Sequence, residues 1–292
     1  MEYAVNIRGL SKAYKDFSLK DVDILLPKGA IMGLIGENGA GKSTTLKAML
    51  DIVRRDSGGG EILGLDLDTD QQRIKEQIGV VWGESHFHEF LDGIQVSHML
   101  GRIYRNWDQE LFLDYMGRFA LPGKKKIKDY SKGMQMKLSI AAALSHHPSL
   151  LILDEATSGL DPVVRDEILD ILFGFIEDGE HSVLISSHIT SDLDKVADYI
   201  TMIHNGSILF SEEKDALIED MGIIKCSQEE LQSLKELESR GGITIVGVRQ
   251  SAYQSECLVR SSREVMERYP ALVMDRTNIE EIMLFYVRGQ MR

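Results

Sequence analysis

The fold of this chain is best predicted from residues 36–44, Gly36-Glu37-Asn38-Gly39-Ala40-Gly41-Lys42-Ser43-Thr44. It matches the pattern G-x-x-x-x-G-K-[ST] at every fixed position, which is typical of a loop that binds nucleotide phosphates. The apolar residues 31–35 before it predict a short buried strand, and Leu46, Met49 and Leu50 after it are spaced as in a helix. The sequence therefore predicts a strand, a phosphate-binding loop and a helix in succession.

The residues of this loop suit a nucleoside triphosphate. Glycines let main-chain N–H groups approach an anion closely, and the start of a helix adds partial positive charge. Lys42 is expected to reach the terminal phosphates, and the Ser43 hydroxyl is expected to contact Mg²⁺. The loop residues predicted to bind the nucleotide are Gly36, Asn38, Gly39, Ala40, Gly41, Lys42, Ser43 and Thr44.

Length and composition exclude several classes of protein. A chain of 292 residues exceeds one typical domain, so we expect two. The net charge of −13 argues against a chain built to hold nucleic acid. Cys226 and Cys257 lack the spacing of a cysteine zinc site and are too few for a disulfide framework. No run approaches the ~20 apolar residues that span a bilayer, so we expect any membrane-spanning part to come from another chain.

The pattern of the first 220 residues predicts an α/β phosphate-loop domain. Residues 3–8 and 17–26 predict strands that form an antiparallel edge on an otherwise parallel sheet. Ser57-Gly58-Gly59-Gly60 predicts a loop. Residues 84–147 predict an inserted helical subdomain, because their apolar residues recur every three or four positions. The other main elements predicted are strands 78–82, 150–154 and 182–186, and helices 71–77, 163–176 and 189–197.

Residues 221–292 predict a small α+β domain of their own. Ser227 and Glu230 form a capping-box pattern at the start of a helix. The predicted order of elements, β-α-β-β-α-β, resembles a ferredoxin-like unit. The segment contains no phosphate loop, metal-ligand spacing or catalytic cluster, so we interpret it as an accessory or regulatory domain.

Hydrolysis of a triphosphate needs Mg²⁺, an activated water and stabilisation of the γ-phosphate. Asp154 ends an apolar run that predicts a buried strand, so its carboxylate suits a contact with Mg²⁺. Glu155 follows and is a candidate general base for the attacking water. His188, after another predicted strand, is a candidate hydrogen-bond partner of the γ-phosphate. Two adjacent acids after a strand also occur as a helix cap, which is the structural alternative.

Some other residues admit two interpretations. Tyr14 is either a surface aromatic or a platform on which a purine ring stacks. The run Lys124-Lys125-Lys126 is interpreted as a solvated loop, with contact to lipid headgroups or a partner as the alternative. His86 and His88 are interpreted as incidental surface histidines, with a metal site as the alternative.

The motifs, taken in order, resemble those of the ATP-binding subunit of an ABC transporter. They are Tyr14, the loop at 36–44, Ser131-Lys132-Gly133-Met134-Gln135, the strand and acids at 150–155, Ser158-Gly159-Leu160-Asp161, and His188. The resemblance covers about residues 1–215. It implies ATP and Mg²⁺ as cofactors and a head-to-tail pair of subunits, either identical or different.

In such a pair, the phosphate loop of one subunit and the signature motif of the other enclose ATP. The resemblance assigns Ser131, Gly133 and Gln135 to the signature and Asp161 to the loop that follows the acids. Ser131 is a predicted helix cap, and a helix start is a second anion-binding site that one copy cannot bring to its own phosphate loop.

Two departures from the family pattern are informative. Lys132 and Met134 replace a glycine and a glutamine of the signature, and such variants resemble bacterial exporter subunits of the ABC-2 class, in particular the Ytr-like subgroup. Gly83 stands where the family has a glutamine that contacts Mg²⁺ and water. Glu84 follows it, and whether Glu84 replaces that glutamine is open.

The expected function is therefore to bind and hydrolyse ATP and to power a separate membrane-spanning permease, with export implied by the subgroup. The expected location is the cytoplasmic face of the cell membrane, and no nucleic-acid partner is expected. The alternative is a soluble ABC-type ATPase in translation or DNA maintenance. Against it, the interval between phosphate loop and signature is short and lacks sustained heptads.

Overall fold

The computed structural model describes residues 2–250, 254–270 and 272–288. It divides into two compact units, Met1–Ser211 and Glu212–Arg292. In chain order, the first unit contains β1 (Tyr3–Ala13), β2 (Ser18–Pro27), β3 (Ile31–Ile35), α1 (Lys42–Met49), β4 (Ser57–Ile62), β5 (Leu65–Asp66), α2 (Gln71–Gln77), β6 (Ile78–Trp82), α3 (Gly93–Leu100), α4 (Gln109–Arg118), the 3₁₀ helix η1 (Ile127–Asp129), α5 (Lys132–Leu144), β7 (Leu150–Asp154), α6 (Pro162–Ile176), β8 (Ser182–Ser187), α7 (Thr190–Val196), β9 (Tyr199–His204) and most of β10 (Ser207–Glu213).

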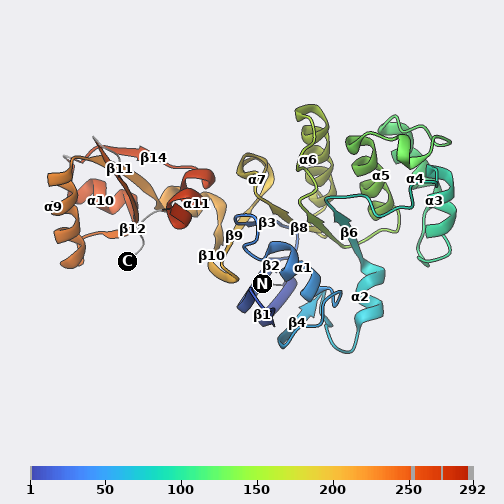
Figure 1. Ribbon diagram of the computed structural model, residues 1–292, viewed down its shortest axis with the longest axis horizontal. Coiled ribbons are helices and arrows are strands. Elements are labelled where there is room, and N and C mark those ends of the chain that lie inside the picture. The colour runs from blue at the N-terminus through green and yellow to red at the C-terminus, as the bar shows by residue number, and fades with distance from the viewer. Residues whose placement is uncertain (1, 251–253, 271, 289–292) are drawn as a thin grey trace. The chain divides into compact units, whose positions relative to one another are not determined.

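The centre of the first unit is a six-stranded sheet with the order β10-β9-β3-β8-β7-β6 (Figure 1). The strands β3 and β7 are buried along their whole lengths, as expected for parallel strands covered on both faces. The four strand pairs from β9 to β6 are parallel. Ile35 lies opposite Ser187, and Asp154 lies opposite Trp82 and Ser186. The residues that follow these strands therefore gather at one edge of the sheet.

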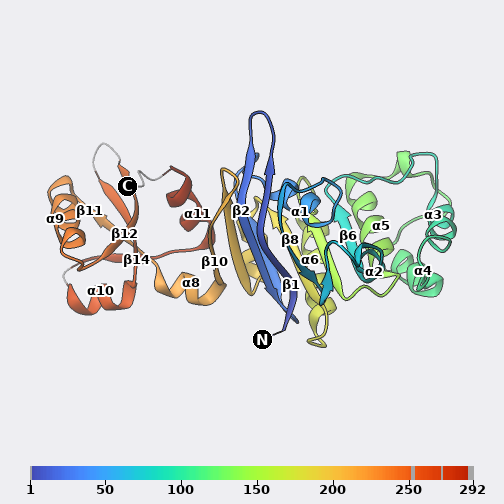
Figure 2. The ribbon, with the colours of Figure 1, turned by 90° about the horizontal axis from the view of Figure 1, so that it is seen from below.

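The first two strands differ from the prediction, because they do not extend the parallel sheet. β1 and β2 form a separate four-stranded antiparallel sheet with the order β2-β1-β4-β5. β1 also continues to Ala13, through residues predicted to be a connection. Figure 2 shows β1 and β2 as a long ribbon of two strands. The prediction of an antiparallel edge was wrong because short-range patterns do not reveal which strand a segment pairs with.

The loop predicted at Ser57–Gly60 is also wrong, since these residues belong to β4. A Cβ atom on Gly60 would lie 2.0 Å from the Asn6 carbonyl oxygen, and one on Gly58 would lie 2.4 Å from the Gly9 carbonyl oxygen. The glycines allow β4 to pair closely with β1. A run of glycines predicts a loop, although here it allows the close approach of two backbones.

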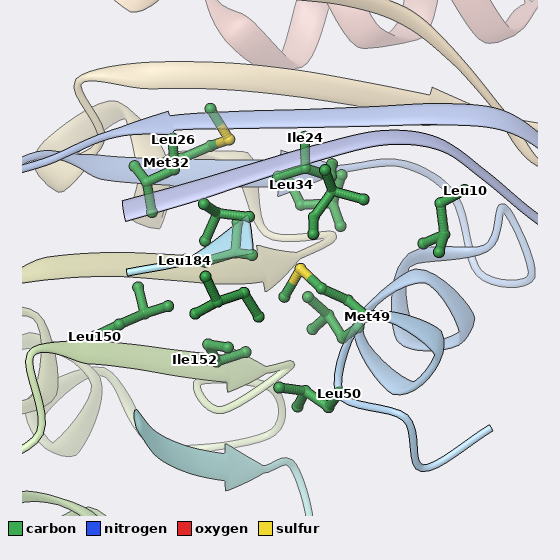
Figure 3. Packing of buried hydrophobic residues seen from close by; sticks show 14 of the residues in the cluster. Leu10, Ile24, Leu26, Met32, Leu34, Met49, Leu50, Leu150, Ile152 and Leu184 are labelled. Carbon is green, nitrogen blue, oxygen red and sulfur yellow. The ribbon is translucent and has the colours of Figure 1, made fainter. Parts of the chain in front are cut away.

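The two sheets and α1 enclose the main core of the unit. Figure 3 shows side chains of β3, β7 and β8 facing side chains of β2, with Met49 of α1 among them. Ile24, Met32, Met49 and Ile152 are fully buried, and each such side chain contributes about 1.5–3 kcal/mol to the free energy of unfolding. This core holds the start of α1, and hence the phosphate loop, against the sheet.

The helical part of the first unit has a core of its own. Figure 1 shows α3, α4 and α5 grouped together. Val96, Phe112 and Leu138, one from each helix, are fully buried in this core. Asp92 and Asp108 cap α3 and α4 by accepting hydrogen bonds from main-chain N–H groups.

The second unit is a four-stranded antiparallel sheet with helices. Its elements are α8 (Lys214–Asp220), β11 (Gly222–Cys226), α9 (Gln228–Ser239), β12 (Thr244–Gln250), β13 (Ser255–Arg260), α10 (Ser262–Arg268), β14 (Met274–Arg276) and α11 (Ile279–Arg288). The strand order is β12-β13-β11-β14, and each neighbouring pair is antiparallel. Ser227 and Glu230 form the predicted capping box of α9.

The division between the units lies before α8, a helix that the sequence did not predict. Arg260 of β13 explains why α8 belongs to the second unit. Its guanidinium donates to Glu212 Oε1 at 2.6 Å and to Asp220 Oδ2 at 3.1 Å, at the two ends of this segment. The shift in composition predicts a boundary at residue 220, the last residue of α8, because composition does not reveal this pairing.

Candidate functional site

The phosphate loop connects β3 to α1, and two of its glycines are required by the packing around it. Gly41 precedes α1 with a φ of 119°, and a Cβ there would lie 2.8 Å from Leu19 Cδ2. A Cβ on Gly36 would lie 2.3 Å from the Ile203 carbonyl oxygen. Gly39 faces open space, with no atom within 4 Å of its Cβ position. The two ends of the loop are therefore tightly packed, while its middle at Gly39 is open.

Lys42 is 5% exposed and directs its ammonium back into the loop. Its Nζ donates to the carbonyl oxygens of Gly36 at 2.7 Å and Glu37 at 3.2 Å. The same Nζ lies 3.1 Å from Glu155 Oε1. A phosphate in the loop would compete with Glu155 for this ammonium, because both are anions and the ammonium has only three N–H donors.

Ser43 and Asp154, the two residues expected to contact Mg²⁺, are hydrogen-bonded to each other. Ser43 Oγ donates to Asp154 Oδ1 at 3.0 Å, and Ser186 Oγ of the neighbouring strand donates to the same oxygen at 2.5 Å. Asp154 is 8% exposed. A hydroxyl and a carboxylate oxygen are ligands that Mg²⁺ prefers, so Ser43 and Asp154 fit this ion. Sequence reasoning missed Ser186; its signal is a polar residue at the end of an apolar strand.

Glu155 lies between the loop lysine and His188. Its Oε2 is 2.5 Å from His188 Nδ1, and its N–H donates to the Ser186 carbonyl oxygen at 3.1 Å. Glu155 has a φ of 54°, a left-handed conformation that is uncommon for residues other than glycine. The side chains of Glu155 and His188 are 22% and 39% exposed, so water reaches both. This arrangement can orient a carboxylate beside a phosphate and its attacking water.

Gly83 follows β6 and lies against the backbone of the two acids. A Cβ on Gly83 would lie 3.2 Å from the carbonyl oxygens of both Asp154 and Glu155. Glu84 is exposed and lines a cavity of about 340 Å³ together with Trp82 and Tyr104. This geometry does not test whether Glu84 replaces the family glutamine.

Tyr14 is 47% exposed in the turn between β1 and β2. Its N–H donates to the Phe17 carbonyl oxygen at 2.7 Å, and Lys12 Nζ lies 5.8 Å from its ring centre. Phe17, in the same turn, reaches the phosphate loop, because its Cζ lies 3.0 Å from the Cβ position of Gly41. Sequence reasoning named Tyr14 and missed Phe17, although both are aromatic residues of one turn.

The signature residues lie at the start of α5, which is apart from α1 in both views (Figures 1 and 2). Ser131 caps the helix by accepting from the Met134 N–H at 3.2 Å, and the Cβ position of Gly133 lies 3.4 Å from Val164 of α6. Asp161 caps α6. Gln135 differs from Ser131 and Gly133, because its side-chain amide already has a partner within the helical part. The amide donates to the Ile127 carbonyl oxygen at 3.2 Å.

The histidines near Gly83 lack the partners of a metal site. Across the part of the chain that the structure describes, no group of three or more His, Cys, Asp and Glu residues is placed to hold a metal ion. His88 Nδ1 instead accepts from the Phe90 N–H, at the long distance of 3.4 Å.

The sequence and the fold were both compared with those of known proteins, and the matches belong to one family. Residues 19–158 match the family described as ABC transporter. The chain is 32% identical over 213 residues to the bacitracin transport ATP-binding protein BcrA of Enterococcus faecalis, covering 72% of this chain and 69% of BcrA. It is 30% identical over 217 residues to the ABC transporter ATP-binding protein YtrB of Bacillus subtilis, covering 74% of each. A solved structure of the ATP-binding subunit of an ABC transporter is similar in fold, with a TM-score of 0.67, 24% identity, and coverage of 80% of this chain and 98% of that one.

Proposed function

Because this chain belongs to the ABC transporter family and is one of its ATP-binding, ATP-hydrolysing subunits, we propose that it drives export through a separate membrane permease. The observation that carries the ATP-hydrolysing part of the proposal is the position of Glu155 between Lys42 and His188. In this role Glu155 accepts the proton of the attacking water, and His188 orients the carboxylate and contacts the γ-phosphate.

The remaining loop residues and the metal ligands follow from the same geometry. Lys42 and the loop N–H groups neutralise the phosphates, while Ser43 and Asp154 hold Mg²⁺. The hydroxyl of Ser186 supports this role, since it orients the Asp154 carboxylate. Tyr14, exposed in its turn, is the proposed platform for the adenine ring.

Each ATP is completed by a second subunit in a head-to-tail pair. Ser131 and Gly133 lie at the start of α5, where the main-chain N–H groups and the helix dipole favour an anion. The distance of α5 from α1 within one chain supports a role on the ATP of the partner copy. Gln135 is a weaker candidate than the other two, because its amide already binds the Ile127 carbonyl oxygen.

A membrane permease is the proposed second partner, and the cytoplasmic face of the membrane is the proposed location. None of the helices in the described residues is long and apolar enough to cross a bilayer. A groove of about 660 Å³ beside β6 is lined by Ile52, Trp82, Ile103 and Tyr104 among others. Ile52 and Ile103 are 58% and 65% exposed, which suits an apolar segment of a permease.

The subgroup and the second unit complete the proposal. The similarity to YtrB and to a protein named for bacitracin transport supports the ABC-2 exporter class and the Ytr-like subgroup. The antiparallel order β12-β13-β11-β14 supports a ferredoxin-like fold for the accessory unit. No specific observation favours the alternative in translation or DNA maintenance.

The decisive experiment is Glu155→Gln. Removal of the general base should lower the rate of ATP hydrolysis about a hundredfold or more, while ATP binding is retained. The variant should also form a stable pair with MgATP, seen as a doubled mass in analytical ultracentrifugation. The wild-type protein with MgADP is the control and should remain a single copy. Hydrolysis at the wild-type rate in the variant would remove Glu155 from this role.

A further inference from the structure

Lys132 occupies an electrostatically unfavourable position at the start of the signature helix. It is the first residue of α5, a helix of 13 residues. A cation there faces the positive end of the helix dipole, where negative charge is preferred. Its Nζ donates a hydrogen bond to the Ser158 carbonyl oxygen at 2.8 Å. This bond holds the lysine in place and connects α5 to the turn that follows the catalytic acids.

The turn at residues 158–161 is in turn connected to Glu155. The Ser158 N–H donates to the Glu155 carbonyl oxygen at 3.1 Å. Two consecutive hydrogen bonds therefore lead from the Lys132 ammonium, through one peptide segment, to the backbone of the residue that carries the general base. The φ of 54° at Glu155 is a left-handed conformation that the surrounding structure must maintain, and the Ser158 bond is one of the contacts that hold this backbone.

The other end of the turn is held from α6. Arg165 Nη2 donates to the Leu160 carbonyl oxygen at 3.4 Å, and its Nη1 lies 3.8 Å from Asp192 Oδ1. Asp192 is 2% exposed and belongs to α7, the helix that begins just after His188. The turn thus has an attachment to α6 and α7, and Lys132 supplies its attachment to α5.

We propose that Lys132 is a positioning residue that couples the two ATP sites of the pair. This inference rests on the proposed function, in which the start of α5 contacts the ATP bound by the second copy. When Ser131 and Gly133 engage that ATP, Lys132 transmits the position of α5 to the 158–161 turn and so to Glu155 of its own site. Solvent competes with the Lys132 bond in one copy, and coverage by the second copy strengthens it.

The test compares steady-state ATP hydrolysis of Lys132→Met with that of a matched control, Lys137→Met. Lys137 lies on the same helix and forms an ion pair with Glu167 of α6, but its partner is not in the turn. We expect Lys132→Met to lower kcat about tenfold with KM changed less than about twofold, and to lower the Hill coefficient for ATP towards one. Lys132→Arg should retain most of the wild-type kcat and cooperativity, because it keeps the cation.

Wild-type kcat and Hill coefficient in Lys132→Met would overturn the inference. An equal loss in Lys137→Met would also overturn it, since the effect would then be general packing of α5 on α6. If Lys132→Met proves unstable in thermal melting, Lys132→Gln provides the same comparison with a polar side chain. Two other results would instead contradict the proposed function. One is a wild-type protein that does not hydrolyse ATP, and the other is a Glu155→Gln variant that hydrolyses ATP at the wild-type rate.

Discussion

At the scale of single residues, the central group of the site is the ammonium of Lys42. Lys42 Nζ bonds to two loop carbonyl oxygens and to Glu155 Oε1. In the proposed mechanism, a γ-phosphate displaces Glu155 from Lys42, and the freed carboxylate accepts a proton from water while His188 still holds its other oxygen. The proposal thereby links nucleotide binding to activation of the base.

Lys42→Ala tests the binding part of this exchange. A lost charge-assisted bond to phosphate is worth about 1.5–3 kcal/mol, so MgATP affinity should fall about tenfold to a hundredfold. Isothermal titration calorimetry in a Glu155→Gln background measures this without turnover. Lys47→Ala is the matched control, because Lys47 lies on the same helix with its Nζ 5.7 Å from the Trp82 ring centre. Unchanged affinity in Lys42→Ala would contradict the loop assignment.

At the scale of elements, the antiparallel sheet depends on the glycines of β4. Gly60 has a φ of 141° and its Cβ position lies 2.0 Å from a carbonyl oxygen of β1, whereas the Cβ position of Gly59 has no atom within 4 Å. Neighbouring residues of one strand therefore differ sharply in their tolerance of a side chain.

Gly60→Ala should destabilise the first unit by about 2–4 kcal/mol, because the strand must shift or a strained backbone must be kept. Gly59→Ala is the control and should change the free energy of unfolding by less than about 1 kcal/mol. Urea denaturation followed by tryptophan fluorescence measures both. Equal effects at the two positions would show that β4 does not pair with β1 as described.

A second element-scale feature is His146, which lies two residues beyond the end of α5. This residue is 1% exposed, and its ring stacks on Tyr104 with 4.0 Å between ring centres. Burial lowers the pKa of His146 from its ordinary value of 6.5. The unfolded chain therefore binds a proton at pH values where the folded chain does not.

The contribution of His146 to the free energy of unfolding is therefore fully present above pH 6.5. It is lost as the pH falls from 6.5 towards the lower pKa of His146 in the folded chain. Urea midpoints at pH 7.5 and pH 5.5 should show a decrease that is smaller in His146→Phe. Asp92 and Asp108 act in another range, because hydrogen bonds from main-chain N–H groups lower the pKa of each from 3.8. An equal decrease in wild type and variant would assign the effect to other groups.

At the scale of the whole molecule, the chain provides separate reporters for its two units. The two cysteines, Cys226 and Cys257, are buried in the second unit, where burial raises the pKa of Cys257 to about 12. The two tryptophans, Trp82 and Trp107, belong to the first unit. Fluorescence and thiol reactivity therefore follow the unfolding of different units.

MgATP added to Glu155→Gln should raise the fluorescence midpoint of thermal unfolding and leave the midpoint of thiol exposure unchanged. A ligand at 100 times its dissociation constant stabilises the unit that binds it by about 2.7 kcal/mol. Labelling with a thiol reagent during the same melt provides the second reading, and MgADP is the control nucleotide. A parallel rise of both midpoints would show that the units unfold together.

The local features could be predicted from the amino-acid sequence. The phosphate loop, the buried strands β3 and β7, the helix α2 and the caps at Ser131 and Ser227 each follow from a short pattern whose physical cause is local: glycine freedom, burial on both faces, or a side chain that satisfies a helix end.

The tertiary structure was needed for every feature that depends on pairing between distant segments. It placed β1 with β4, tied α8 to Arg260, and brought Ser43, Asp154 and Ser186 onto shared hydrogen bonds. It also joined Lys132 to Ser158. Register and partner choice are set by the packing of the whole unit, which no short pattern contains.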